Sequence, residues 1–155
     1  TDTGQDTDGV QMSSICVGIL DPGEAGITTG WITRGITVIN ANSNSDAGYR
    51  VTVTQETQQG QDAPTTGDNF YLYETSGSAD DQISFYLVEG TTPSTTSASE
   101  PTGTKLKQGS DAFNFGNLTT ALQTKEYTFV AEGNQLDKVS VGDYTTTLTA
   151  TLTAN

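Results

Sequence analysis

The feature that most constrains the fold of this chain is an alternation of apolar and polar residues with a period of two. Its strictest examples are residues 49–54, which read Tyr-Arg-Val-Thr-Val-Thr, and residues 145–154, where Leu148, Ala150 and Leu152 alternate with threonines. Successive side chains of a strand point to opposite faces, so this pattern predicts strands with one buried face. No segment of useful length shows the roughly 3.6-residue period of an amphipathic helix. We therefore predict an all-β fold.

Shorter clusters of apolar and β-branched residues predict the other strands, at residues 10–20, 31–39, 70–73, 83–88, 111–118 and 127–131. The polar run of residues 40–46 predicts a turn, and the segments on its two sides are interpreted as a hairpin. Residues 91–103, rich in Thr and Ser with Pro93 and Pro101, are interpreted as an exposed loop. Together these segments predict one sandwich of about seven to nine antiparallel strands.

The composition limits the number of domains and the kinds of partner. A chain of 155 residues fits one domain, since single cores serve roughly 100–200 residues. Six Lys and Arg against 19 Asp and Glu give a net charge of −13, which repels phosphate backbones and anionic lipid headgroups. No apolar run approaches the ~20 residues of a membrane helix. We therefore expect neither nucleic acid as a partner nor membrane insertion of the mature chain. The start at Thr1 predicts a secreted product whose leader has been removed.

The residue types needed for common catalytic chemistry are scarce. The chain has no histidine, the commonest general base and transition-metal ligand. Its only cysteine, Cys16, lacks a histidine partner and is interpreted as a small buried hydrophobe. Acidic pairs such as Asp80 and Asp81 are expected by chance in an acidic chain, although a glycosidase needs only two carboxylates. We predict that the protein is not an enzyme and uses no cofactor.

Two binding functions remain open from the residues alone. The acidic loops Asp6-Thr7-Asp8-Gly9 and Asp80-Asp81 offer hard oxygen ligands for calcium, but they contain only fragments of a calcium loop, so solvated turn carboxylates are the favoured interpretation. A carbohydrate platform is the other candidate, and core or cross-strand pairing is the favoured interpretation of its aromatic residues. These residues are Trp31, Tyr49, Tyr71, Tyr73, Tyr86 and Tyr127. Asn117-Leu118-Thr119 is an N-glycosylation sequon, which makes Asn117 a candidate modification site.

Two stretches carry a resemblance to known surface proteins. The segment Gly142-Asp143-Tyr144-Thr145-Thr146-Thr147-Leu148-Thr149-Ala150-Thr151-Leu152 resembles the closing strand of pilin-like domains, including the spore-coat U and archaic chaperone–usher pilus subunits. Their pattern is Gly-x-Tyr followed by an alternating Thr/Leu/Val strand. The segments Gly35-Ile36-Thr37-Val38 and Gly48-Tyr49-Arg50-Val51-Thr52-Val53 resemble the paired strands of many bacterial and archaeal surface β-sandwiches.

The resemblance implies an incomplete immunoglobulin-like sandwich that a strand from a neighbouring subunit completes. On this hypothesis residues 1–20 are an N-terminal extension that donates the strand, and residues 21–155 form the β-sandwich domain. The candidate plugging residues are Val10, Met12, Ile15 and Val17. Main-chain pairing with side chains entering pockets supports open-ended, head-to-tail association of identical subunits.

The function predicted from the sequence is therefore a structural subunit of an extracellular pilus or fibre at the cell surface. Its partner would be the protein itself, with host or abiotic surfaces as targets of adhesion or biofilm formation. The alternative is a monomeric secreted module that binds carbohydrate or calcium.

Overall fold

The computed structural model describes residues 9–12, 30–56, 61, 64–75, 81–91, 95–140 and 142–155. The first strands are β1 (Gly9–Met12), β2 (Trp31–Ser43), β3 (Tyr49–Gln55), β4 (Phe70–Glu74), β5 (Gln82–Glu89) and β6 (Thr95–Ser97). They are followed by β7 (Lys105–Leu106), β8 (Ser110–Phe115), β9 (Thr119–Glu132), the 3-10 helix η1 (Gly133–Lys138), β10 (Tyr144–Thr145) and β11 (Leu148–Ala154). No helix in these parts of the chain is long and apolar enough to cross a membrane.

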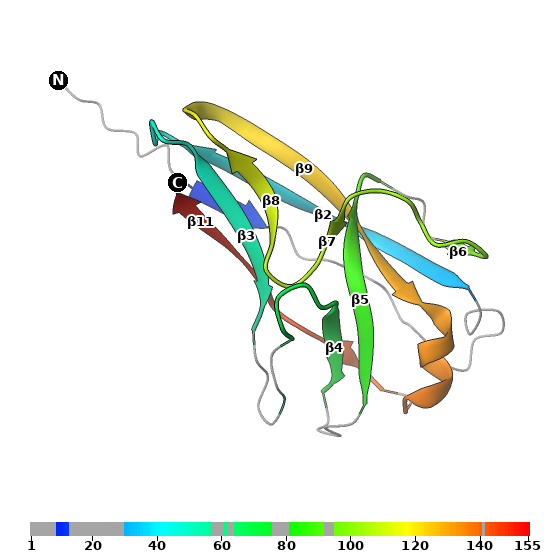
Figure 1. Ribbon diagram of the computed structural model, residues 1–155. Helices are drawn as coiled ribbons and strands as arrows, with labels where there is room; N and C mark the ends of the chain where they lie inside the picture. Colours follow the sequence, from blue (N-terminus) through cyan, green and yellow to red (C-terminus); the bar gives the residue numbers. More distant parts are fainter. Residues whose placement is uncertain are drawn as a thin grey trace.

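The strands form two antiparallel sheets that face each other (Figure 1). The larger sheet has the order β1-β2-β9-β5-β4-β10, with β6 added to β2 and β7 added to β5. The smaller sheet has the order β11-β3-β8. The all-β antiparallel sandwich predicted from the sequence is therefore confirmed.

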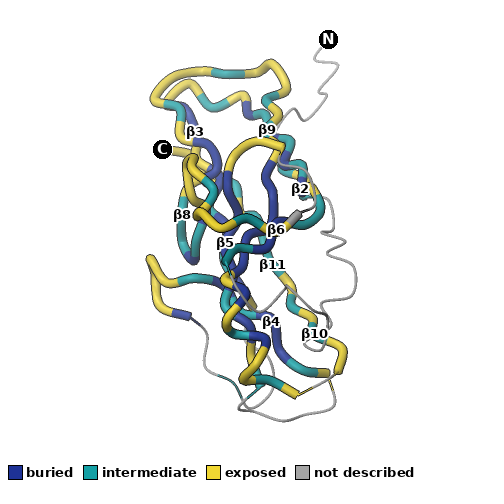
Figure 2. Tube along the Cα trace, turned by 90° about the vertical axis from the view of Figure 1, so that its right-hand side faces the viewer, coloured by how far each residue is buried: buried dark blue, intermediate teal, exposed yellow. Residues whose placement is uncertain are grey.

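The core lies between the two sheets and is built from alternate residues of their strands. Tyr49, Val51 and Val53 of β3 are fully buried in it, as the alternation predicted. Aromatic rings fill much of the remaining space, and Phe85 stacks on Phe129 with ring centroids 4.8 Å apart. Buried positions run along the inner strands, whereas exposed positions concentrate at turns (Figure 2). The apolar residues of the period-two pattern thus form one core that both sheets share.

The predicted hairpin between residues 31–39 and 49–53 is wrong. β2 pairs with β1, β6 and β9 in the larger sheet, whereas β3 pairs with β11 and β8 in the smaller one. The turn between them, which contains a 3.1 Å hydrogen bond from the Gly48 N–H to the Ser45 carbonyl, takes the chain across the core. Alternation shows which face of a strand is buried. It does not show which strand lies beside it.

Two other segments differ from the sequence prediction. Residues 95–97, inside the predicted loop, form β6 and pair with residues 31–33 of β2. The continuous strand predicted over residues 145–154 is divided, because β10 pairs with β4 in the larger sheet and β11 pairs with β3 in the smaller sheet. The crossing lies in the run Thr145-Thr146-Thr147, where no Gly or Pro marks it.

Two glutamine amides, those of Gln55 and Gln135, each form a pair of hydrogen bonds with the main chain of one strand residue. The amide of buried Gln55 donates to the Tyr71 carbonyl at 2.8 Å and accepts from the Tyr71 N–H at 2.7 Å. Gln135 of η1 likewise accepts from the Ser84 N–H at 2.7 Å and donates to the Ser84 carbonyl at 2.9 Å. Tyr71 and Ser84 are register partners in β4 and β5. The two amides therefore satisfy main-chain groups that point away from this pair.

A second apolar cluster lies on the opposite face of the larger sheet. Tyr86, Val88 and Val130 are buried there, with Trp31 packed against them. The Tyr86 hydroxyl donates to Glu100 at 2.8 Å, and the Lys105 ammonium, which pairs with Glu100, lies 4.7 Å from the centroid of the Tyr86 ring. Burial raises the pKa of Tyr86, and the hydrogen bond to Glu100 and the charge of Glu100 raise it further. Tyr86 is thus a fixed, protonated phenol.

Thr37 is an unsatisfied polar group in the core. The register of β2 against β9 shifts between Arg34 and Thr37, and Thr37 is fully buried with no hydrogen-bond partner for its Oγ1. Because an unmade buried hydrogen bond costs about 1–3 kcal/mol, Thr37→Val is expected to stabilise the protein by about 1 kcal/mol. Thermal unfolding should then occur about 2–4 °C higher.

The matched control for this prediction is Thr128→Val in β9. Thr128 is also fully buried, but its Oγ1 donates to the Gly90 carbonyl at 2.8 Å. The same change of hydroxyl to methyl should therefore destabilise the protein at this position. Equal effects of the two substitutions on the melting temperature would contradict the assignment.

Candidate subunit interface

β1 is a short edge strand of the larger sheet. Its four residues pair with β2 in a register that runs from Gly9 opposite Asn42 to Met12 opposite Ile39. Val10 and Met12 are half-buried and pack against the core, whereas Gly9 and Gln11 are exposed. β1 is therefore held by main-chain pairing to one strand and by two apolar side chains.

The position occupied by β1 is a slot between the edges of the two sheets. β11, the edge strand of the smaller sheet, lies beside β1 (Figure 1). Leu148, Ala150 and Leu152 of β11 are half-buried against the same core as Val10 and Met12. We define the β1 slot as residues 39–42 of β2 and residues 148–152 of β11. Without β1, the apolar side chains along this side of the core would lose their cover.

The structure places part of the predicted donor segment. Val10 and Met12 lie in the β1 slot of their own chain, so the chain completes its own sandwich at this position. Ile15 and Val17 lie outside the described residues, as does Cys16. Donation of the strand to a neighbouring subunit stays a prediction.

The candidate carbohydrate aromatics divide into three groups. Tyr49 and Tyr127 belong to the core. Tyr71 and Tyr73 form a pair with ring centroids 6.3 Å apart. Trp31 and Tyr86 meet edge-on on the outer face of the larger sheet, with centroids also 6.3 Å apart and an interplanar angle of 60°. Trp31 of β2 and Tyr86 of β5 come together across β9, which lies between these strands in the sheet. The sequence did not show this pair, because it does not show the order of the strands.

The other candidate sites are placed as follows. Asp6, Asp8 and Asp80 lie outside the described residues, and Asp81 accepts a 3.2 Å hydrogen bond from the Ser140 N–H. In the described ranges, no group of three Asp, Glu or Cys residues is arranged to hold a metal ion. Asn117 is exposed between β8 and β9, and its glycosylation stays a prediction.

Sequence reasoning missed the structural roles of Gln55 and Gln135. Each is a single polar residue whose importance depends on a main-chain edge far away in the sequence, so no local pattern marks it. The only available signal was the position of Gln55, which is the next alternate residue after the buried residues Tyr49, Val51 and Val53. A polar residue at a buried position of a strand needs a hydrogen-bond partner.

Comparisons with protein-family models, curated proteins and solved structures gave no match for this chain.

Proposed function

We propose that the protein is the structural subunit of an extracellular filament in which neighbouring copies exchange β1. The observation that supports this most directly is the β1 slot, where a four-residue N-terminal strand covers the core between β2 and β11. In the filament, β1 of one subunit occupies the slot of the next. Repeated head-to-tail, this exchange gives an open chain of identical subunits.

The contacts of the slot are the same whether β1 comes from its own chain or from a neighbour. Within the chain, Val10 and Met12 pack against the core and β1 pairs with residues 39–42, and the proposed exchange keeps these contacts. Exchange therefore costs little contact energy, and the balance between the two forms depends on concentration and on the segment that joins β1 to β2. Residues 13–30 supply that segment, and 18 residues reach at most about 60 Å when extended.

A cysteine pair across the slot distinguishes the two arrangements. Gln11 and Asn40 are register partners in β1 and β2, and opposed residues in an antiparallel pair are close enough for a disulfide. In a Cys16→Ser background, Gln11→Cys with Asn40→Cys is oxidised after fibres have formed and have been seen by electron microscopy. Exchange of β1 is expected to give a ladder of covalent oligomers on a denaturing gel without reductant.

The matched control places the cysteine pair where no exchange is proposed. Arg50 of β3 and Thr153 of β11 are register partners and both are exposed, so Arg50→Cys with Thr153→Cys should give only cross-linked monomers. A monomer band alone from the β1 pair in fibres would overturn strand exchange. Absence of fibres from the natively isolated protein would overturn the filament function.

A further inference from the structure

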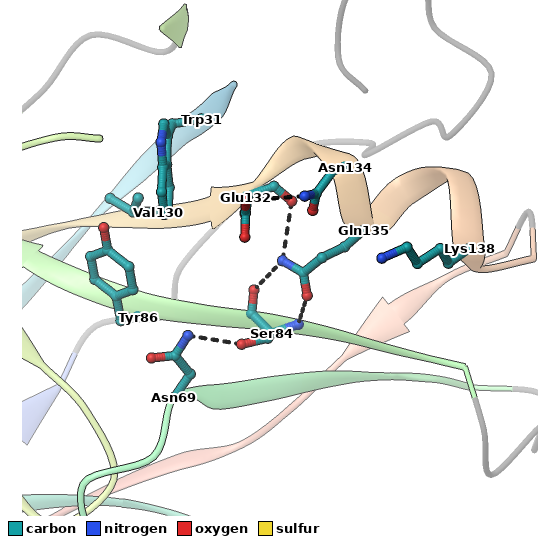
Figure 3. Close-up of a pocket in the computed structure, with 9 residues that line it drawn as sticks. All are labelled: Trp31, Asn69, Ser84, Tyr86, Val130, Glu132, Asn134, Gln135 and Lys138. Atoms are coloured by element: carbon teal, nitrogen blue, oxygen red, sulfur yellow. Dashed lines mark hydrogen bonds between the residues drawn. The ribbon is translucent and has the colours of Figure 1, made fainter. Parts of the chain in front are cut away.

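A hollow of about 280 Å³ opens on the outer face of the larger sheet, beside η1. Its lining comes from β2, β5, β9, η1 and the residue that precedes β4 (Figure 3). The volume lies just below the roughly 300–1,000 Å³ of sites for drug-sized ligands. No residue of β1 or β11 lines the hollow. It is therefore independent of the proposed assembly site.

One end of the hollow is aromatic. Trp31 and Tyr86 lie at this end, and Lys138 lies at the other (Figure 3). Trp31 is half-buried against the outer cluster, and its neighbour Tyr86 is fixed by Glu100 and Lys105. An indole held in this way offers an apolar surface and an N–H donor to a small ligand.

Apart from Lys138, the polar side chains of the hollow are held in place by hydrogen bonds. Asn69 donates to the Ser84 hydroxyl at 2.8 Å, and Asn134 donates to the Glu132 carboxylate at 3.1 Å. Gln135 is fixed to the main chain of Ser84 and also donates to the Glu132 carbonyl at 3.1 Å. A ligand would therefore meet groups that are already oriented, which lowers the entropy cost of binding.

Several of these side chains keep unused hydrogen-bonding capacity. Among the contacts of the described residues, the Trp31 indole N–H and the Lys138 ammonium have no hydrogen-bond partner, and the Asn69 carbonyl oxygen accepts no bond. The second oxygen of the Glu132 carboxylate is likewise without a donor. The hollow thus presents two donors and two acceptors around one apolar surface.

The charges of the site favour a neutral ligand. Glu132 and Lys138 contribute one charge of each sign, and the net charge of −13 repels anions. A ligand that satisfies donors and acceptors without carrying charge is one rich in hydroxyl groups, since each hydroxyl both donates and accepts. A pyranose ring has this chemistry, and its C–H face packs on an aromatic side chain.

We propose that this hollow binds a neutral saccharide, in the form of one pyranose ring of a glycan. The ring packs on Trp31 while its hydroxyls bond to Asn69 and Glu132. A site of this size with few hydrogen bonds is expected to bind one sugar ring with millimolar affinity. In a filament the site would be repeated on every subunit, and its avidity for a multivalent glycan would rise accordingly.

The test is a titration of isotope-labelled protein, followed by two-dimensional NMR, with glucose, galactose, mannose and N-acetylglucosamine. At least one sugar is expected to shift the Trp31 indole and Asn69 amide resonances in a saturable way. Asn69→Ala and Glu132→Ala are each expected to weaken the binding of that sugar at least tenfold, because each removes a partner of a sugar hydroxyl. Glu132 is exposed, so its substitution keeps the fold even where Asn69→Ala does not.

The matched control is Asn114→Ala on the smaller sheet, where an exposed asparagine donates to Asp111. This variant should bind the sugar like the unmodified protein. Absence of saturable shifts with all four sugars would overturn the proposal, as would equal loss of binding in the control. Shifts of the same resonances by free amino acids, with none by the sugars, would also overturn it.

Discussion

Replacing Val10 and Met12 with aspartate in one variant is expected to abolish fibres, whereas Gln11→Asp in the same strand is expected to leave them intact. Val10 and Met12 pack against the core of the chain and Gln11 is exposed. In the proposed filament, the same two side chains would pack against the core of the subunit that accepts β1. A carboxylate cannot enter that apolar layer without losing its hydration or expelling the strand. The loss of two apolar side chains alone is expected to weaken β1 docking by about 2–4 kcal/mol.

The measurement is electron microscopy of the two purified proteins under conditions in which the unmodified protein polymerises. Gln11→Asp controls for the added negative charge, since it changes the charge of the strand without touching the core. Circular dichroism of the double variant should still show a β-rich spectrum. Fibres of normal number and length from the double variant would contradict the role given to β1.

Gln55→Leu is expected to destabilise the protein by about 3 kcal/mol. The substitution leaves both the N–H and the carbonyl of Tyr71 without the partners that the Gln55 amide now supplies. Each unsatisfied main-chain group that is shielded from water costs about 1–3 kcal/mol. Because leucine is similar in size to glutamine, the effect arises from lost hydrogen bonds more than from a cavity.

Thermal and urea unfolding would measure this change, with a melting temperature lower by about 6–12 °C. Gln82→Leu in β5 is the control, because Gln82 is exposed and a surface substitution of this kind changes stability by about 0.5 kcal/mol or less. A difference between the two variants smaller than 1 kcal/mol, roughly the value of one hydrogen bond, would show that water replaces the Gln55 amide.

The sequence predicted the strands that have a clear period-two pattern, such as β3, whereas β6, β7 and the first half of β9 have no such pattern and were missed. The alternation of Val51 and Val53 with polar neighbours was enough to predict that these two side chains are buried. The pairing of strands has no such local signal, and for this reason the chain was wrongly expected to turn back on itself between β2 and β3. The crossing between β10 and β11 was missed because threonine suits a strand in either sheet.

For the candidate sites as well, residues within one short stretch could be predicted, whereas residues brought together by strand pairing could not. The apolar residues Val10 and Met12 were identified from a short stretch, and they do pack against the core. Trp31 and Tyr86 were named as aromatic candidates, but only the placement of β2, β9 and β5 side by side brings them to one hollow. Asn69, Glu132 and Lys138 carry no motif. Their meeting depends on η1 folding against the sheet after β9 ends.

The glutamine bonds to Tyr71 have a consequence for the form of any assembly. Beyond β4, the larger sheet is covered by β10 at Tyr73 and Glu74 and by the Gln55 amide at Tyr71. A sheet edge closed in this way offers no template for the strand of another molecule. A covered sheet edge also prevents edge-to-edge association, through which fibres would branch or aggregate. In the proposed filament, linear growth would therefore depend on this closed sheet edge as well as on the β1 slot.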